Sequence, residues 1–259
     1  MNNDIIQCET HQHVTTVTLN RPEQRNALST ALRTRITETF LHLAEDKATR
    51  VIILTGRGKA FSAGLDLKEL GQHGLQTGDD TSIDLHTAIT RVGKPLIGAI
   101  NGAAITGGFE IALMCDILIA SSAASFADTH VRMGVVPGWG LSQRLSRLIG
   151  ASRAKELSFS GNFLSAELAE RWGLVNHVLA PDELLPHCQR LAEDIKNVDP
   201  LTLKAVHELI DFGGQHSLSE GLLHEKTLGA AHRGDLSAGK LESRRLDALV
   251  RGRQQQKLN

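Results

Sequence analysis

Apolar residues along the chain are spaced in two ways, one typical of strands and the other typical of helices. Residues 13–20 alternate between apolar and polar positions, as a half-buried strand does. Short continuous apolar runs are typical of strands that are buried on both faces. Such runs, or shorter strand-like segments, occur at 50–56, 96–100, 116–121 and 173–179.

Residues 29–45 show the helical spacing most clearly, with Leu32, Ile36, Phe40 and Leu43 on one face and Ser29 as the predicted N-cap. Shorter helices are predicted in the segments LDLKEL, 83–92 and FEIALMC, whereas the polar, glycine-rich residues 71–82 indicate a mobile surface loop. From residue 138 onward the pattern is mainly helical. The predicted helices lie near 138–148, 151–159, 165–171, 182–197, 201–212, 217–231 and 235–252.

Alternating strands and helices predict an α/β fold with a helical C-terminal region. We place the boundary near the segment NVDP, which gives a spiral core over residues 1–195 and a helical region over 196–259. Within the core, VIILTG and LIGAI are each followed by a glycine-containing loop and then by a helix. The same layout therefore occurs twice.

Both of these loops carry small residues that let a ligand approach the backbone closely. They are Ser62, Ala63 and Gly64 in the first loop and Thr106, Gly107 and Gly108 in the second. Two backbone N–H groups that converge on one carbonyl oxygen form an oxyanion hole, which stabilises an enolate or a tetrahedral anion. Tight turns between a strand and a helix also use small residues, so either loop alone has a purely structural explanation.

Glu110 follows the second loop within an apolar helix. Such a carboxylate can simply complement the helix dipole. Its apolar neighbours, however, favour a desolvated carboxyl group with a pKa raised toward the range that is useful for acid–base chemistry.

Composition excludes several other classes of function. The 259 residues have a net charge of −1, 3% aromatic residues and no tyrosine, which argues against nucleic acid or an anionic membrane as the partner. No apolar stretch has the length of a membrane span or of a signal peptide. The three cysteines are widely spaced and the twelve histidines lack the spacing of a metal site. We therefore expect a cytoplasmic protein without a bound metal.

Four segments of the chain resemble the enoyl-CoA hydratase/isomerase, or crotonase, family. They are KAFSAGLDLKEL, PLIGAINGAAITGGFEIALMCDILIAS, FADTHVRMGVVPGWGLSQRL and AELAERWGLVNHVL, in the order that the family has. The early segment VTLNRPEQRNAL is also similar, so the resemblance runs from about residue 5 to residue 195. It is specific for the family and less specific for the reaction.

The resemblance implies a spiral of ββα units whose C-terminal helices build a homotrimer or a dimer of trimers. The substrate it implies is an acyl-CoA thioester, so that coenzyme A arrives with the substrate and no separate cofactor is needed. By motif, the oxyanion hole maps to the N–H groups of Ala63 and Gly107. The substrate-binding residues that it implies are Lys59, near the phosphates of coenzyme A, and Ala63, Gly64, Leu65, Asp66 and Gly107.

The chain departs from the family at a catalytic position. The family's hydratases use two glutamates, of which the first matches Glu110 and the second belongs to a motif Phe-x-x-Pro-Glu. Here that motif reads Phe126-Ala-Asp-Thr-His130, so a histidine replaces the second glutamate. On an extended segment Asp128 and His130 point the same way, and Asp128 could then orient the imidazole.

Three interpretations of His130 remain open. It can do the work of the second glutamate, since an imidazole accepts or donates a proton near neutral pH. Glu110 can instead act alone, as in a double-bond isomerisation, or His130 can be structural.

We therefore predict an enzyme that hydrates the 2,3 double bond of a trans-2-enoyl-CoA, with Glu110, His130 and Asp128 as catalytic residues. The alternatives are an enoyl-CoA Δ-isomerase, another CoA-thioester lyase or hydrolase, and an acyl-CoA-binding protein without catalytic activity.

Overall fold

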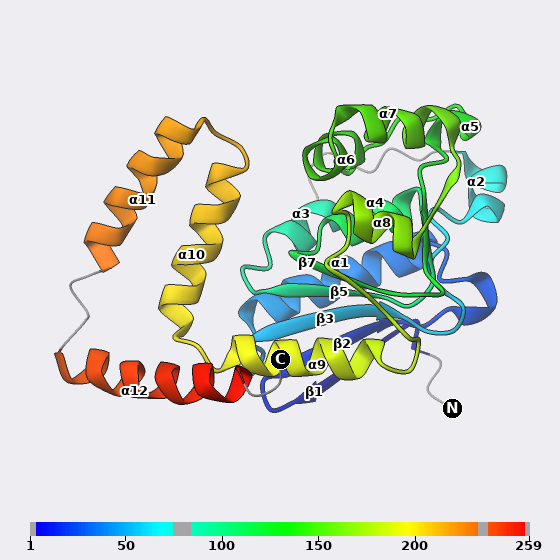
Figure 1. The fold of residues 1–259 in the computed structure, drawn as a ribbon. Helices are drawn as coiled ribbons and strands as arrows, with labels where there is room; N and C mark the ends of the chain where they lie inside the picture. Colours follow the sequence, from blue (N-terminus) through cyan, green and yellow to red (C-terminus); the bar gives the residue numbers. More distant parts are fainter. Residues whose placement is uncertain (1–3, 75–83, 233–237, 257–259) are drawn as a thin grey trace. The chain divides into compact units, whose positions relative to one another are not determined.

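In the computed structural model, which describes residues 4–74, 84–232 and 238–256, the strands form two sheets. The larger sheet has six strands in the order β1-β2-β3-β5-β7-β10 (Figure 1). All neighbours in it pair in parallel except β1 and β2, which form an antiparallel hairpin. The strands are β1 Ile6–His11, β2 Val14–Leu19, β3 Val51–Gly56, β5 Leu96–Ile100, β7 Ile117–Ser121 and β10 His177–Leu179.

Both faces of the larger sheet are covered. In β3, Ile52 and Leu54 belong to the main hydrophobic core, while Val51 and Ile53 belong to a second core that includes Cys188 of helix α9 (Leu184–Lys196). Burial on both faces explains why this strand is a continuous apolar run rather than an alternating one.

The smaller sheet consists of four short strands in the order β4-β6-β8-β9. Each of β4, β6 and β8 follows a strand of the larger sheet directly, so the repeated unit is two strands and a helix. The strands are β4 Ala60–Ser62, β6 Ala103–Ile105, β8 Ser125–Ala127 and β9 Phe163–Ser165. The sequence pattern predicted loops at β4 and β6 and no strand at β9, because three residues are too few to show a strand period.

The helices of the core agree with the predicted ones within a few residues at each end, and Ser29 caps α1 by accepting a hydrogen bond from the Leu32 N–H. The pattern missed β1 and the short helix α5, whose first residue is His130. Part of the loop predicted at 71–82 is helical to His73, and residues 75–82 lie outside the described residues. The helices are η1 Pro22–Gln24, α1 Thr30–Glu45, α2 Leu67–His73, α3 Leu85–Thr90, α4 Gly107–Leu113, α5 His130–Met133, α6 Leu141–Ile149, α7 Ala151–Ser160, α8 Ala166–Trp172 and α9 Leu184–Lys196.

The chain divides into two compact units, residues 1–198 and 199–259, close to the predicted boundary after residue 195. The second unit consists of helices α10 Pro200–Gly213, α11 Leu218–His232 and α12 Ala238–Gln255. Neither α10 nor α11 buries any residue. No helix in the described ranges is both long enough and apolar enough to cross a membrane.

Candidate active site

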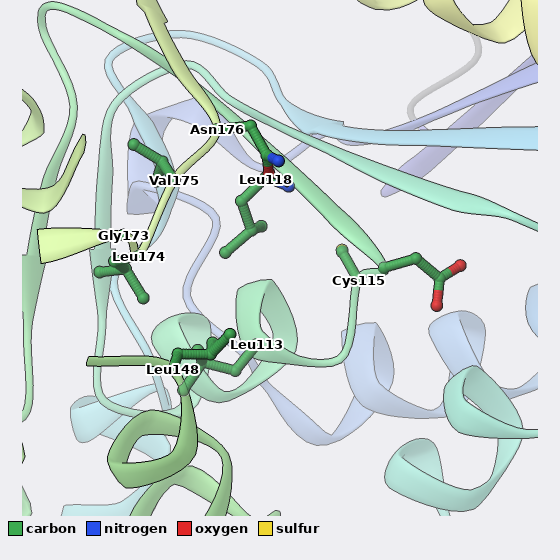
Figure 2. Close-up of a pocket in the computed structure, with 9 residues that line it drawn as sticks. Leu113, Cys115, Leu118, Leu148, Gly173, Leu174, Val175 and Asn176 are labelled. Carbon is green, nitrogen blue, oxygen red and sulfur yellow. Dashed lines mark hydrogen bonds between the residues drawn. The ribbon is translucent and has the colours of Figure 1, made fainter. Parts of the chain in front are cut away.

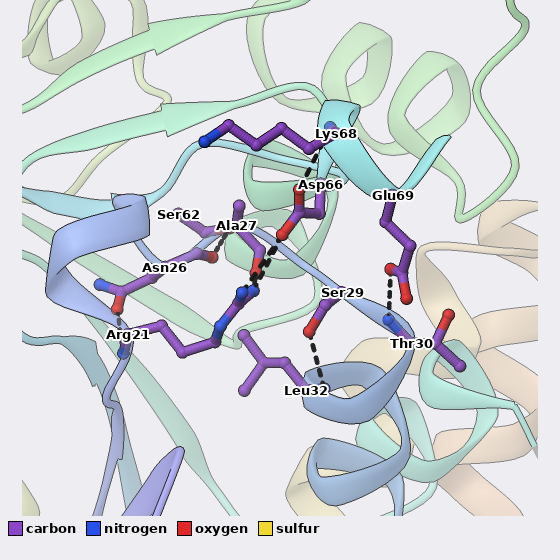
Figure 3. Close-up of polar contacts among 10 residues, drawn as sticks. All are labelled: Arg21, Asn26, Ala27, Ser29, Thr30, Leu32, Ser62, Asp66, Lys68 and Glu69. Carbon is purple, nitrogen blue, oxygen red and sulfur yellow. Dashed lines mark hydrogen bonds and ion pairs between the residues drawn. The ribbon is translucent and has the colours of Figure 1, made fainter. Parts of the chain in front are cut away.

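Asn26, a fully buried residue with a left-handed backbone (φ 54°), holds the first of the two loops in place. Its side chain accepts a hydrogen bond from the Arg21 N–H at 2.8 Å. The same side chain donates to the carbonyls of Arg57 and Ala60 at 3.1 and 2.8 Å. The Asn26 carbonyl in turn accepts the Ser62 hydroxyl at 2.8 Å (Figure 3). Asn26 therefore ties the turn after β2 to strand β4, which leads into the loop.

The two glycine-containing loops approach one another closely at Gly64 and Gly107. Gly64 has a φ of +83°, and a Cβ atom added there would lie 2.7 Å from the Ile105 carbonyl oxygen and 3.3 Å from the Gly107 nitrogen. Only glycine fits such an approach without displacing backbone. The pairing of β4 with β6, which precede the two loops, brings the loops together.

The N–H groups of the first loop differ in their availability. The Ala63 N–H donates to the Arg25 carbonyl at 3.0 Å and is therefore already paired, which disagrees with its predicted role in an oxyanion hole. The Gly64 N–H faces the Ser62 hydroxyl at 3.3 Å. Within the described residues, the N–H of Leu65 has no acceptor, and neither has that of Gly107. Each of the facing loops therefore offers an unpaired donor close to Gly64, the N–H of Leu65 in the first loop and the N–H of Gly107 in the second.

An ion pair fixes the residue that follows Leu65. The Arg21 guanidinium lies 3.2 Å from Asp66 Oδ2, and both side chains are largely buried. Asp66 also caps α2 by accepting a hydrogen bond from the Lys68 N–H (Figure 3). Lys59, the other residue predicted to bind the substrate, has an exposed side chain.

Glu110 lies in α4, where every residue is buried, and only 3% of its surface is exposed. The Trp139 backbone N–H donates to its Oε1 at 2.7 Å. Its second oxygen, Oε2, lies 3.5 Å from His130 Nε2. The carboxylate is thus held by one oxygen and turned toward the imidazole with the other.

Asp128 and His130 are paired, but not because the segment is extended. Thr129 precedes α5, and His130 is the first residue of that helix. Asp128 Oδ1 accepts both the His130 N–H at 3.2 Å and the ring Nδ1 at 2.6 Å. The Asp128 carboxylate therefore keeps a proton on Nδ1, which is the donor of this hydrogen bond, while Nε2 faces Glu110.

Charge around the imidazole holds it in the protonated form. Burial by itself lowers the pKa of His130, but the hydrogen bonds and charges of Asp128 and Glu110 outweigh burial and raise this pKa to about 9. Burial opposes ionisation of Asp128, yet hydrogen bonds from His130 and Ser158 bring the pKa of Asp128 below its usual value. At pH 7 the site therefore holds an imidazolium ion beside an ionised Asp128.

The structure brings Glu110, Asp128 and His130 together, as predicted. Reasoning from sequence missed Asn26, Arg21 and the Trp139 N–H. Asn26 and Arg21 lie in the quoted segment NRPEQRNAL, so a signal existed for them. The Trp139 contact is made by a backbone group and had no side-chain signal. None of the described residues forms a metal-binding group of three or more His, Cys, Asp or Glu side chains.

A cavity of about 300 Å³ lies apart from these residues, at the C-terminal end of α4 (Figure 2). Apolar side chains such as Leu113, Leu148 and Leu174 line much of it. Cys115, whose pKa is raised by burial, also lines it. None of the predicted catalytic residues lines this cavity.

Comparison with known proteins gives consistent matches. Residues 9–233 match the model of the enoyl-CoA hydratase/isomerase family. A probable peroxisomal enoyl-CoA hydratase of Arabidopsis thaliana is 39% identical over 243 residues, which are 93% of this chain and 90% of the relative.

Solved structures agree with these matches. An enoyl-CoA hydratase subunit from Geobacillus kaustophilus superposes with a TM-score of 0.84 at 34% identity, covering 95% of this chain and 96% of the other. The enoyl-CoA hydratase of Mycobacterium tuberculosis superposes with a TM-score of 0.74 at 42% identity, covering 88% and 98%. The crotonase fold predicted from the sequence is thus confirmed.

Proposed function

Because the chain belongs to the enoyl-CoA hydratase/isomerase family, we propose that it is a hydratase that adds water to the 2,3 double bond of a trans-2-enoyl-CoA thioester. The observation that carries this proposal is the buried pair of Glu110 Oε2 and His130 Nε2, 3.5 Å apart. The two atoms offer a proton acceptor and a proton donor on adjacent sides of one site.

In the proposed reaction, the Glu110 carboxylate removes a proton from water while the water oxygen forms a bond to C3. The electron pair of the double bond moves through C2 toward the thioester oxygen and gives an enolate. His130 then donates its Nε2 proton to C2, and the thioester carbonyl re-forms. Transfer of the proton from Glu110 back to His130 restores both groups.

Asp128 keeps the Nδ1 proton on the imidazole throughout. It lies 2.6 Å from Nδ1, so it stabilises the imidazolium ion and aims Nε2 at the substrate. The alternative of a double-bond isomerase needs only one base. A buried acid that faces Glu110 therefore favours hydration.

We assign the oxyanion hole to the N–H groups of Leu65 and Gly107, in place of Ala63. This assignment is supported by the close approach of the two loops at Gly64 and by the lack of another acceptor for either N–H group among the described residues. Coenzyme A enters as part of the substrate and lies along the segment from Ala63 to Asp66. No other cofactor takes part.

A homotrimer or a dimer of trimers is the proposed assembly. Large apolar side chains of the second unit are exposed, among them Leu201 at 63%, Ile210 at 69% and Leu218 at 79%. The exposure of several large apolar side chains in one unit supports association with further subunits. The cysteines of the chain are free, which supports a cytoplasmic location.

Purified protein given crotonyl-CoA, and in parallel a 3-enoyl-CoA, tests the reaction. We expect the absorbance of the conjugated thioester to fall with crotonyl-CoA. A Glu110→Gln variant should lose about 10²-fold or more of this rate, because an amide does not take up the proton. Glu156→Gln on the exposed face of α7 is the matched control and should keep the wild-type rate.

Two other outcomes contradict the proposal. Isomerisation of the 3-enoyl substrate without hydration of crotonyl-CoA identifies an isomerase. Affinity for the CoA ester without turnover identifies a binding protein.

A further inference from the structure

Thr106 has a backbone conformation that side chains rarely adopt. Its φ is 51° and its ψ is −112°, and it is the only β-branched residue with a positive φ among the described residues. For a β-branched side chain this conformation is strained and persists only where the surroundings impose it. Glycine would adopt it freely, so the threonine side chain must contribute something that glycine lacks.

Four hydrogen bonds hold Thr106 in this conformation. Its carbonyl accepts the Glu110 N–H at 2.9 Å. Its N–H donates to the Ala127 carbonyl at 2.8 Å. Its hydroxyl lies 2.5 Å from the hydroxyl of Thr129 and accepts the Thr129 N–H at 3.3 Å. Two of the four bonds therefore involve the Thr106 hydroxyl, and both connect it to Thr129.

Each of the two threonines is adjacent in sequence to a residue that takes part in the proposed reaction. Thr106 immediately precedes Gly107, whose N–H is one of the two proposed oxyanion donors. Thr129 lies between Asp128 and His130. The hydroxyl pair thus links the loop that contains the oxyanion donor to the segment that carries the acid.

We propose that Thr106 and Thr129 are positioning residues whose hydroxyl pair sets the distance between the Gly107 N–H and the His130 imidazole. The proposal rests on the proposed hydratase function. In that reaction the thioester oxygen and C2 are two bonds apart and must meet Gly107 and His130 at the same time. A small displacement of one segment relative to the other then lowers the rate of the chemical step.

Replacing Thr129 with valine tests this, since valine keeps the shape of the side chain and removes the hydroxyl. With crotonyl-CoA we expect kcat to fall about 10- to 100-fold while KM stays within about 3-fold of wild type. Thr129→Ser restores the hydroxyl and should recover kcat to within about 3-fold. The pH at which activity declines in the alkaline range should be the same as in the wild type, because the charges around His130 are unchanged.

Thr15→Val is the matched control. Thr15 forms a hydroxyl pair with Thr49 at 2.6 Å, also between segments distant in the sequence, and both of these residues are buried in the large sheet region. This variant should lower the melting temperature and leave kcat unchanged. If Thr129→Val does not fold, Thr129→Ala provides the same comparison.

The outcomes separate the two proposals. A wild type without turnover contradicts the hydratase function and the positioning role with it. A wild type with turnover, together with a Thr129→Val or Thr129→Ala variant whose kcat is within 2-fold of it, contradicts the positioning role alone. A Thr129→Ser variant as slow as Thr129→Val contradicts it too, because the effect would then not depend on the hydroxyl.

Discussion

A histidine at position 130 changes the chemistry of the site relative to a second glutamate. Between Asp128 and Glu110 the imidazole is held as a cation, with a pKa of about 9. A glutamate at the same place would add a third acidic group to a buried site that already contains two. The imidazolium instead offsets their charge, and in the proposed reaction it carries the proton that the substrate receives.

Replacing Asp128 with asparagine tests this at the level of one residue. Loss of the carboxylate removes a group that raises the pKa of His130, so this pKa falls. Because the protonated form is the active acid, kcat/KM for crotonyl-CoA should decline as pH rises through about 9 in the wild type. In Asp128→Asn the decline should begin about one pH unit or more lower, together with a lower maximum.

A pH profile of kcat/KM for the two proteins measures this directly. If the declines coincide, Asp128 does not set the protonation of His130.

The residues of the site differ in how far the sequence could predict them. Glu110 and His130 could be found, because side-chain types in a family motif carry the chemistry. The predicted oxyanion donor Ala63 lies two positions before Leu65, whose N–H has no acceptor among the described residues. Which N–H is free depends on the Arg25 carbonyl, and that pairing is formed only by the folded chain.

At the scale of helices and strands, the number of residues in each element decided whether its hydrophobic pattern predicted it. Helix α1 spans four turns and shows its period and its cap clearly, so its prediction is confirmed. Strands β4, β6, β8 and β9 have three residues each and show no period. They nevertheless position the site, because they bring the loops after β4 and β6 and the segment after β8 side by side.

The N-cap of α1 gives a prediction for an element. Ser29 accepts the Leu32 N–H at 3.3 Å, and Ser29→Ala leaves this donor without a side-chain acceptor. The free energy of unfolding should fall by about 1 kcal/mol, measured by urea denaturation. Ser146→Ala, inside α6, is the control. It should change the free energy of unfolding by less than about 0.5 kcal/mol, because Ser146 is not a cap and alanine has the higher helix propensity. Equal effects of the two replacements would show that capping is not the cause.

At the scale of the whole molecule, the division into two units follows from composition and contacts. The first unit contains both sheets and all the residues of the site, and the second contains three helices. The boundary predicted from the sequence lies near this division because the strand patterns stop before the helical region. The sequence pattern did not predict that large apolar residues of the second unit, such as Leu201 and Ile210, are exposed in the single chain.

The central claim is that His130 supplies the proton that completes hydration, and one measurement tests it most directly. In His130→Gln the side chain can still donate a hydrogen bond but has no proton to give up. We predict that kcat/KM for the hydration of crotonyl-CoA falls about 10²-fold or more, while His177→Gln, at an exposed histidine, retains the wild-type value. A His130→Gln variant within a few-fold of the wild type would contradict the claim and make His130 a structural residue.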